Sequence, residues 1–526
     1  MLPVYHWTHQ FEVSNDDLDY ISGQLLEREI PLSAEELTRA LIDRRLAEES
    51  AALEARYEDV RLYDPAQQYE VDQKIMFPAL DYQIGTVVSR RDGTNIFAYS
   101  DYTVITVRFD DTAEAVERKF AAILTTPHKL SAQNGDSADH APWQTKFTVE
   151  QILENAGEML TSKVQNALLQ NDDLISVASM WFARSLMLDV NEGHLNLAEA
   201  ILDISEGGPI STEEMLNQIG SLGKSSRELQ VFCLNDALNR DNRFDEVGPL
   251  NAIWWYLRRL EPPEVLTPPP MLVYNAIDYN RNLFTSEMRE LELEIDDEWS
   301  DPLDEEMLTQ LDETEITLNY PHRRVGTLPL NARMRRVFPT ALRTPRIYVT
   351  LVDGQDQEEY VGWVLRGERF VYGLGALYRK HRLPVGAHVT IKRDADPSKI
   401  VVDFQAYRPR TEWIRIITPK DGNITFEDQK RAIGANYDEL MLFGADDLAA
   451  VDGLFSQHQR KGITTLVKTL LTELSRATPH TAIHGKTLYS AVNITRRCPP
   501  GPIFAAMIDN PDFEYVGNNY WKLSEI

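Results

Sequence analysis

TAIHGKTLYSAV (residues 481–492) and PIFAAMIDNPDFEYVGNNYWKL (residues 502–523) are the two stretches that predict the fold of the C-terminal part of the chain. Both contain apolar residues at helical spacing, and LVKTLLTEL (residues 466–474) predicts a helix before them. FEYVG and YWKL flank two asparagines, and such a turn between alternating apolar residues predicts a β-hairpin. We therefore expect three short helices and a hairpin, with a core of Leu466, Val467, Leu470, Leu471, Leu474, Leu488, Val492, Ile503, Phe504 and Met507.

The same pattern occurs earlier in the chain. GGPISTEEMLNQIG (residues 207–220) and VFCLNDALNRDNRFDEVG (residues 231–248), followed by Trp254 and Trp255, repeat the order of the C-terminal stretch. A helix, a Pro-containing turn and an Ile come first, and two helices, Asn, Phe, Val-Gly and Trp follow. A repeated order of this kind predicts two copies of one unit, at residues 194–258 and 460–526. Three helices followed by a hairpin is the winged-helix arrangement.

The C-terminal copy, with IHGKTLY at 483–489, FEYVG at 513–517 and YWKL at 520–523, resembles the HARE-HTH family. This winged-helix module is also found in the delta subunit of bacterial RNA polymerase. Residues 194–258 resemble a degenerate second copy, and the two copies cover about a quarter of the chain. The resemblance implies contact with DNA or with the transcription machinery, although winged helices also bind proteins.

Charge distinguishes the two copies. Residues 194–258 hold 5 basic and 10 acidic side chains, whereas residues 460–526 hold 8 and 5. Because a DNA-binding face needs Lys and Arg, we expect the first copy to contact protein and the last to contact DNA. Lys486, Arg496 and Arg497 are the predicted phosphate partners, with an ordinary solvated surface as the alternative.

A third resemblance concerns residues 69–110. YEVDQKIMFPALDYQIGTVVSRRDG (residues 69–93) and TVITVRFDD (residues 103–111) resemble the Tudor-like barrel of CarD-type RNA-polymerase-interacting domains and of some helicase tails. Asp72 replaces the usual turn glycine. The resemblance implies a small barrel that binds a partner protein through a strand edge or an aromatic surface. The alternative is a purely structural barrel.

Charge also divides the whole chain, whose formal net charge is -29 over 526 residues. Residues 287–315 contain 14 acidic residues and one Arg, whereas residues 316–415 contain 18 Lys or Arg and 9 Asp or Glu. The acidic run is either a solvated segment or an intramolecular mimic of phosphate that covers the neighbouring basic surface.

The basic segment is the strongest nucleic-acid candidate. Aromatic and cationic residues interleave in it, which suits phosphate contact combined with base stacking. LPVGAHVTIKR (residues 383–393) resembles B3-type DNA-binding barrels. The alternative is an Arg face paired with the acidic run, because Arg binds carboxylates as well as phosphates. The predicted nucleic-acid contacts are Arg323, Arg324, Arg333, Arg335, Arg336, Tyr378, Arg379, Lys380, Arg382, Lys392, Arg393, Arg408, Arg410 and Trp413.

Catalytic and metal-binding patterns are sparse in this sequence. It contains no phosphate-binding loop, zinc-protease motif or nucleophile elbow. His6 and His9 lack a third metal ligand, and His480 and His484 lie in a predicted turn and strand, where a spacing of four does not align their side chains. Cys498 has no acid–base partners, and Asp110, Glu117 and Lys119 only superficially match a nuclease set. We therefore predict no metal, no cofactor and no catalytic residues.

Together these patterns predict a cytoplasmic α+β multidomain protein without a membrane partner. We expect a non-enzymatic, DNA-associated regulator or adaptor linked to transcription, with duplex DNA and RNA polymerase or another transcription protein as partners. A protein–protein scaffold with an internally neutralised Arg surface and an unrecognised nuclease are the alternatives. The predicted segments are a helical arm (1–64), a Tudor-like barrel (65–127), a linker (128–147), an acidic winged helix within 148–260, a Pro-rich and acidic spacer (261–315), a basic β-rich domain (316–415), a connector (416–459) and a C-terminal winged helix (460–526).

Overall fold

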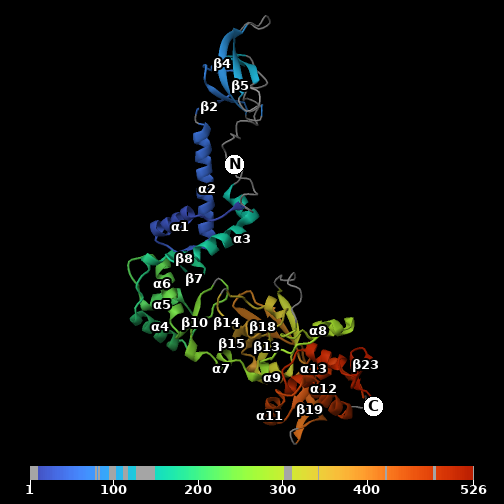
Figure 1. Ribbon diagram of the computed structural model, residues 1–526. Helices are drawn as coiled ribbons and strands as arrows, with labels where there is room; N and C mark the ends of the chain where they lie inside the picture. Colours follow the sequence, from blue (N-terminus) through green and yellow to red (C-terminus); the bar gives the residue numbers. More distant parts are fainter. Residues whose placement is uncertain are drawn as a thin grey trace. The chain divides into compact units, whose positions relative to one another are not determined.

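The computed structural model has an α+β architecture (Figure 1). It describes residues 10–57, 59–77, 80, 83–93, 102–109, 116–125, 148–250, 252–300, 311–341, 343–420, 423–477 and 481–524. The chain divides into two compact units, residues 1–188 with 224–232 (unit 1) and residues 189–223 with 233–526 (unit 2). Among the described helices, none has the length and apolar character needed to cross a membrane.

Unit 1 contains a module of three helices and a small sheet, which we call module 1. Its elements are α1 (Asn15–Arg28), β1 (Leu32–Ser33), α2 (Ala34–Tyr57), α3 (Val149–Leu168), β7 (Leu174–Val177) and β8 (Met180–Ala183). A capping box begins α2, because Ser33 and Glu36 bond each other's backbone N–H groups. The predicted helical arm is part of this module, since α1 and α2 share a core with α3 and β8.

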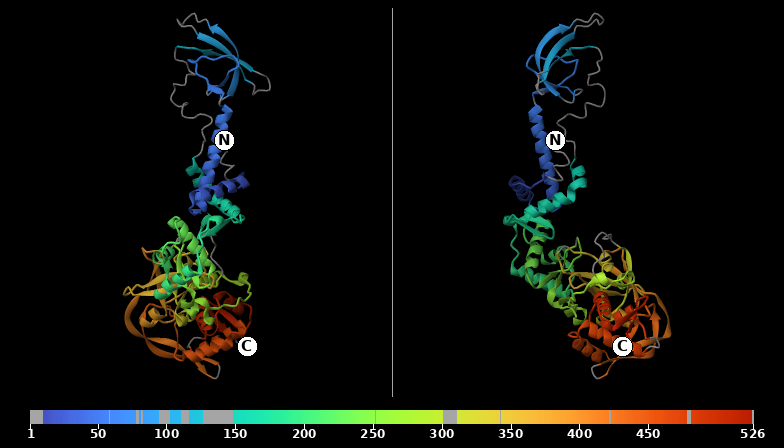
Figure 2. Two further views of the ribbon diagram at one scale, coloured as in Figure 1. Left: turned by 90° about the vertical axis from the view of Figure 1, so that its left-hand side faces the viewer. Right: turned by 45° about the vertical axis from the view of Figure 1, so that its right-hand side comes forward.

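A curved five-stranded sheet is inserted between α2 and α3 of module 1 (Figure 2). Its strands follow chain order: β2 (Val60–Leu62), β3 (Lys74–Phe77), β4 (Gln83–Gly93), β5 (Tyr102–Phe109) and β6 (Val116–Ala122). Aromatic side chains form much of its core, including Phe77, whose ring centroid lies 4.2 Å from that of Phe120. The sheet lies within the predicted segment 65–127, except that β2 precedes it. The predicted linker at 128–147 lies outside the described residues.

Unit 2 contains both predicted repeats. The first comprises α4 (Glu192–Ile204), β9 (Ile210–Ser211), α5 (Thr212–Ile219), α6 (Arg227–Arg240, whose first residues belong to unit 1), β10 (Phe244–Glu246) and β11 (Trp254–Leu257). The second comprises α12 (Ile463–Ala477), β22 (Ile483–His484), α13 (Gly485–Thr495), α14 (Pro500–Ile508), β23 (Phe513–Gly517) and β24 (Tyr520–Leu523). We call them modules 2 and 3. The predicted apolar core and C-terminal hairpin of module 3 are both confirmed.

The three modules share one strand register. In each, the short first strand pairs with the last strand, so that the sheet order is first, third, second. A buried Trp of the last strand lies opposite a buried Leu or Ile of the first, as Trp181 opposite Leu32, Trp255 opposite Ile210 and Trp521 opposite Ile483. The repeat is therefore threefold, whereas the sequence led us to expect two copies.

A seven-stranded sheet forms the centre of the basic domain. Its order is β12 (Glu313–Thr317), β17 (His388–Arg393), β18 (Lys399–Asp403), β14 (Arg346–Asp353), β15 (Glu359–Leu365), β16 (Phe370–Tyr372) and β13 (Thr327–Pro329). The short helices α9 (Tyr320–Val325) and α10 (Gly375–Lys380) accompany it. Because β12 comes from the acidic run and pairs with β17, the predicted boundary at 315/316 cuts through this sheet.

A long hairpin follows the sheet. β19 (Ala406–Lys420) pairs with β20 (Asn423–Ala435) and with β21 (Phe443–Ala445), and α11 (Leu448–His458) comes next. The predicted boundary at 415/416 is wrong because it falls inside β19. The hairpin, which we call the β19–β20 hairpin, joins the basic domain to module 3, and Ile417, Phe426 and Phe443 lie in one core cluster with α12, α13 and α14.

The proline-rich segment is packed rather than free. Val265 and Leu272 are buried in a cluster with Trp363 of β15. Pro263 begins a single helical turn, α7 (Pro263–Leu266). Proline fits the first helical turn, where its missing N–H has no partner to lose. After it, α8 (Ser286–Ile295) also packs against module 3.

Candidate functional site

The exposed part of the β19–β20 hairpin carries three of the predicted nucleic-acid residues on one strand. Trp413 is 64% exposed, and the Nζ of Lys430, its partner across the hairpin, lies 4.9 Å from its ring centroid. Arg408 and Arg410 are exposed on the same strand, and the guanidinium of Arg410 lies 5.5 Å from the ring centroid of Tyr407. Among the described residues, these three cations have no carboxylate at ion-pair distance.

Several other predicted contacts are neutralised by the chain itself. Arg324 pairs with Asp452 at 2.7 Å, Arg333 with Asp296 at 3.4 Å and Lys392 with Glu313 at 3.4 Å. Two of these carboxylates belong to the acidic run, so part of that run does pair with the basic domain. In these places the predicted cations meet carboxylates instead of an open surface.

Lys380 lies among three carboxylates. Its ammonium bonds Asp356, Glu358 at 2.7 Å and Asp353 at 3.1 Å, and these bonds raise its pKa. Within the described chain, Asp353, Asp356 and His381 have ligand atoms within 4.8 Å of one another, which is close enough to hold a metal ion. Because the ammonium is already ion-paired with both aspartates, we interpret this group as an ion-pair network.

Three predicted contacts are buried and therefore wrong as surface residues. Tyr378 is fully buried and donates a hydrogen bond to the carbonyl of Thr327 at 2.9 Å. Lys486 is 7% exposed and pairs with Asp438 at 2.6 Å and with Glu294. Arg497 is 2% exposed. These cations already have partners inside the protein, so they are not available to phosphate.

The remaining predicted cations lie in two settings. Arg335 donates to the carbonyl of Leu330 at 3.2 Å, Arg393 to that of Arg336 at 3.2 Å, and Arg496 to that of Lys461. Arg336 is partly buried. The other three, Arg323, Arg379 and Arg382, line a separate cleft that is described below.

Two of the three helices of module 3, α13 and α14, are not available to a ligand. Every residue of α13 is buried, and so are residues 500–507 of α14. A helix that reads DNA must reach the groove with exposed side chains. The prediction that Lys486 and Arg497 contact DNA is therefore corrected, because both side chains lie in this buried interior of unit 2.

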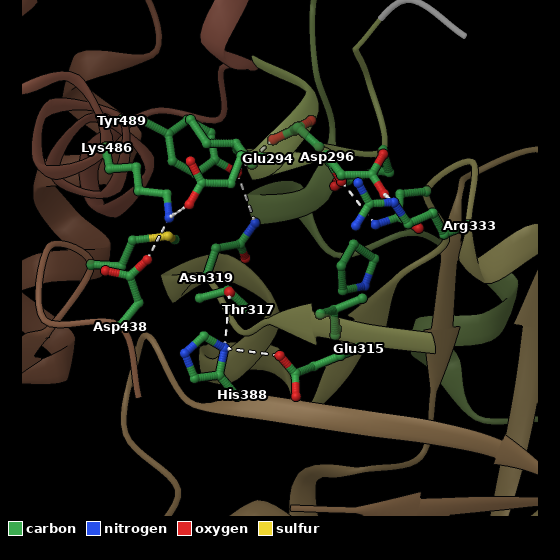
Figure 3. A pocket seen from close by; sticks show the side chains of 17 residues that line it. Glu294, Asp296, Glu315, Thr317, Asn319, Arg333, His388, Asp438, Lys486 and Tyr489 are labelled. Carbon is green, nitrogen blue, oxygen red and sulfur yellow. Dashed lines mark hydrogen bonds and ion pairs between the residues drawn. The ribbon is translucent and has the colours of Figure 1, made fainter. Parts of the chain in front are cut away.

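A polar cavity of about 390 Å³ lies between this interior and the basic domain (Figure 3). Figure 3 shows Lys486 between Glu294 and Asp438 on one side and Arg333 beside Asp296 on the other. His388 lies 3.6 Å from Glu315 across the β12–β17 pair. Carboxylates dominate the lining, and each of those named here has a cationic or histidine neighbour.

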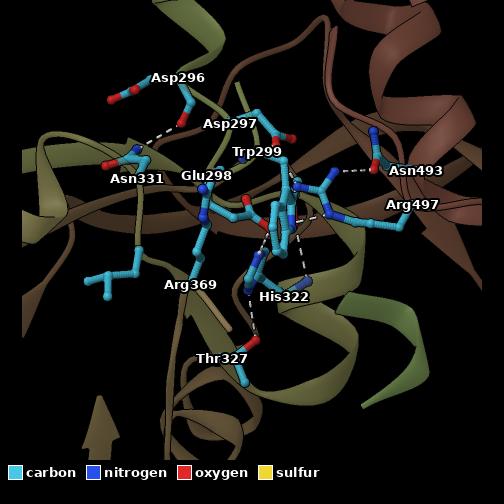
Figure 4. A network of polar contacts seen from close by, with 12 residues as sticks. Asp296, Asp297, Glu298, Trp299, His322, Thr327, Asn331, Arg369, Asn493 and Arg497 are labelled. Carbon is cyan, nitrogen blue, oxygen red and sulfur yellow. Dashed lines mark hydrogen bonds and ion pairs between the residues drawn. The ribbon is translucent and has the colours of Figure 1, made fainter. Parts of the chain in front are cut away.

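A buried ionic network borders the cavity (Figure 4). The guanidinium of Arg497 lies 2.6 Å from both Asp297 and Glu298 and donates to Asn493 at 2.7 Å. Nε2 of His322 lies 3.1 Å from Glu298. Burial alone raises the pKa of Glu298, but the Arg497 charge and the His322 contact outweigh burial and leave it at about 2. The network joins the acidic run, α9 and α13.

Asp296 gives a pH-dependent prediction. Burial raises its pKa to about 6, with Arg333 opposing and Asp297 and Glu298 adding to the shift. The folded protein then holds a proton that the unfolded chain releases, so the free energy of unfolding falls as pH rises from about 4 to about 6. We expect Asp296→Asn to raise this free energy by about 1–3 kcal/mol at about pH 7.5 and hardly at all at about pH 4.5. Urea unfolding at the two pH values measures it, and equal effects at both would contradict it.

The residues considered for chemistry offer no assembled catalytic group in the described part of the chain. Cys498 is buried, and burial raises the pKa of its thiol to about 12, which opposes a nucleophilic role. His6, His9, His480 and Asp110 lie outside the described residues. Glu117 and Lys119 are on β6, and the paired strand β5 places them across from Arg108 and Thr106.

Sequence reasoning missed module 1 and the network around Arg497. A signal for module 1 is present, because PLSAEEL (residues 31–37) closely matches PISTEEM (residues 209–215). Each stretch contains the first strand and the start of the second helix. No comparable signal identifies the Arg497 network, whose members lie far apart in the chain.

In comparisons with known proteins, no family model, no curated protein and no solved structure matches the chain.

Proposed function

We propose that the protein is a non-enzymatic, nucleic-acid-associated adaptor that holds nucleic acid on the β19–β20 hairpin. The observation that carries this proposal is the exposed indole of Trp413 with Lys430 beside it, on a hairpin whose exposed Arg408 and Arg410, like Lys430, have no carboxylate partner among the described residues. Bases stack on exposed aromatic rings, and Arg or Lys nearby neutralises the phosphates between them. The accessible ring favours unpaired bases over a duplex, since duplex bases already stack on each other.

The helical modules are not the proposed nucleic-acid contact. Their helix order and shared strand register support their being winged helices. In module 1, the exposed residues of α3 include Glu150, Glu154 and Glu158, which repel a polyanion. We propose that modules 1 and 2 contact protein. A transcription protein such as RNA polymerase is the proposed partner class, on the strength of the HARE-HTH resemblance.

A protein scaffold without nucleic-acid affinity is the second candidate. The pairing of Arg324, Arg333, Lys380 and Lys392 with the chain's own carboxylates favours it. The two candidates differ in salt dependence, because phosphate binding weakens steeply as salt rises and releases bound counterions. A scaffold has no such affinity at any salt concentration.

The test is binding of a fluorescently labelled single-stranded oligonucleotide to the full-length protein, measured by anisotropy. We expect Trp413→Ala to weaken binding by about tenfold or more, since one base stack is worth about 1–3 kcal/mol. Trp413→Phe should retain part of the affinity. Tyr520→Ala is the matched control, because Tyr520 is also exposed but lies on the hairpin of module 3.

Two outcomes would overturn the proposal. One is a wild-type protein that binds neither single strands nor duplex at low salt, which would leave the scaffold candidate. The other is an affinity that Tyr520→Ala lowers and Trp413→Ala does not, which would place the contact on module 3.

A further inference from the structure

A second cleft in unit 2 gathers five arginines. Its volume is about 470 Å³. Arg323 and Arg324 come from α9, Arg379 from α10, Arg382 from the turn after it and Arg431 from β20. The walls between them are mostly apolar and include Val385, Ile414, Ile416, Ile433 and Phe443.

The arginines of this cleft outnumber its carboxylates. Arg431 is paired with Asp446, at 2.9 and 3.0 Å, and Arg324 with Asp452. For Arg323, Arg379 and Arg382, the described part of the chain contains no carboxylate at ion-pair distance. These three arginines therefore have no carboxylate partner among the described residues, and the partly buried Arg323 in particular needs a counter-charge because it is partly removed from water.

Of these three arginines, Arg323 has the most contacts with the surrounding protein. Its Nε donates to the carbonyl of Leu383, and its guanidinium lies 5.8 Å from the ring centroid of Tyr378. Burial lowers its pKa, and the nearby charge of Arg379 adds to this effect. The side chain is therefore fixed in place without a compensating anion. Arg379 and Arg382 are exposed and complete the positive rim.

Two glycines leave bare backbone in the lining of the cleft. Gly326 has a left-handed backbone with φ of 77°, and a Cβ there would lie 2.5 Å from the Cα of Gly375. A Cβ on Gly375 would in turn lie 3.3 Å from Nη1 of Arg379. A side chain at either position would push the end of α9 away from the start of α10 or displace Arg379. The two glycines therefore allow the arginines of α9 and α10 to lie close together.

We infer that this cleft binds a small phosphorylated ligand of nucleotide size. Guanidinium groups bind phosphate oxygens through paired hydrogen bonds, and three uncompensated guanidiniums match a ligand with two or more phosphates. The volume lies within the range of small-molecule sites, about 300–1,000 Å³, and the apolar walls suit a base or another flat group. The inference is independent of nucleic-acid binding at the hairpin, because it rests on different residues.

The experiment is calorimetric titration of the full-length protein with inorganic pyrophosphate and, separately, with ATP. We expect the wild type to bind both, with ATP tighter because its base meets the apolar walls. Arg379→Ala with Arg382→Ala should weaken both by about tenfold or more, since charge-assisted bonds are about twice as strong as neutral ones. Both residues are exposed, so the double variant should fold.

Arg460→Ala with Arg476→Ala is the control, because it removes two exposed arginines of unit 2 that lie outside the cleft lining. It should bind both probes like the wild type. Failure of the wild type to bind either probe at millimolar concentration, or equal losses in the cleft and control variants, would overturn the inference. A cleft variant that loses affinity for the oligonucleotide but not for pyrophosphate or ATP would also overturn the inference, because the arginines would then bind the phosphates of a nucleic acid. Trp413→Ala should leave both titrations unchanged, which separates this inference from the hairpin proposal.

Discussion

Replacing Arg497 by Met should lower the free energy of unfolding by about 3–5 kcal/mol, because removing one partner of a buried ion pair leaves uncompensated charge in the interior. Here two buried carboxylates, Asp297 and Glu298, lose the guanidinium that lies 2.6 Å from each of them. Methionine keeps the length of the side chain, so the loss of charge dominates over the loss of volume. The shift in the urea unfolding midpoint of the full-length protein measures the effect.

The effect should depend on pH in a defined direction. In the wild type, the pKa of Glu298 is lower in the folded protein than in the unfolded chain. Its ionised form therefore stabilises the fold at pH values above the unfolded-state pKa, and this stabilisation is lost as pH falls toward about 2. In Arg497→Met, the carboxylates are favoured in their protonated form instead, so the variant should gain relative stability as pH falls. Adding Asp297→Asn and Glu298→Gln should restore part of the loss at neutral pH. A cost below about 1 kcal/mol would contradict the network, since ordinary surface substitutions stay within about 0.5 kcal/mol.

Replacing Trp255 by Ala should cost about 3–5 kcal/mol, the range for truncating a buried aromatic residue. Trp255 is 1% exposed, and its Nε1 donates to Thr212 at 2.9 Å and to Asn235 at 3.0 Å. Truncation removes the ring from the centre of module 2 and leaves these two polar groups without their donor. The register shared by the three modules predicts similar costs for Trp181→Ala and Trp521→Ala.

Trp413→Ala is the matched control for this series, because it removes the same side chain from an exposed position. Its free energy of unfolding should stay within about 0.5 kcal/mol of the wild-type value. If Trp255→Ala and Trp413→Ala shift the urea unfolding midpoint equally, Trp255 does not contribute to the core of module 2 as described.

The sequence predicted the modules better than it predicted their surroundings. The pattern of FEYVG, two asparagines and YWKL identified the last hairpin, because strand alternation and turn chemistry are local properties. Module 1 was missed because residues 58–148, which include a complete sheet, separate its second helix from its third. The fixed spacing on which repeat recognition depends was therefore lost, although PLSAEEL still matches PISTEEM.

The candidate contacts were less predictable than the fold. Arg497 and Arg408 look alike in sequence, since both lie in polar stretches, Arg497 next to Arg496 and Arg408 next to Pro409. One is buried against carboxylates some 200 positions away, and the other is exposed on a hairpin. Composition shows how many cations a segment has, but tertiary contacts decide which of them remain available. The charge count alone therefore overestimated the open basic surface.

Photo-crosslinking tests the hairpin proposal most directly. The full-length protein is irradiated with a single-stranded oligonucleotide that carries iodouracil, and the attached peptides are identified by mass spectrometry. We expect crosslinks on β19, centred on Trp413, that disappear at high salt and in Trp413→Ala. Crosslinks confined to the hairpin of module 3 or to α3 of module 1, with none on β19, would contradict it.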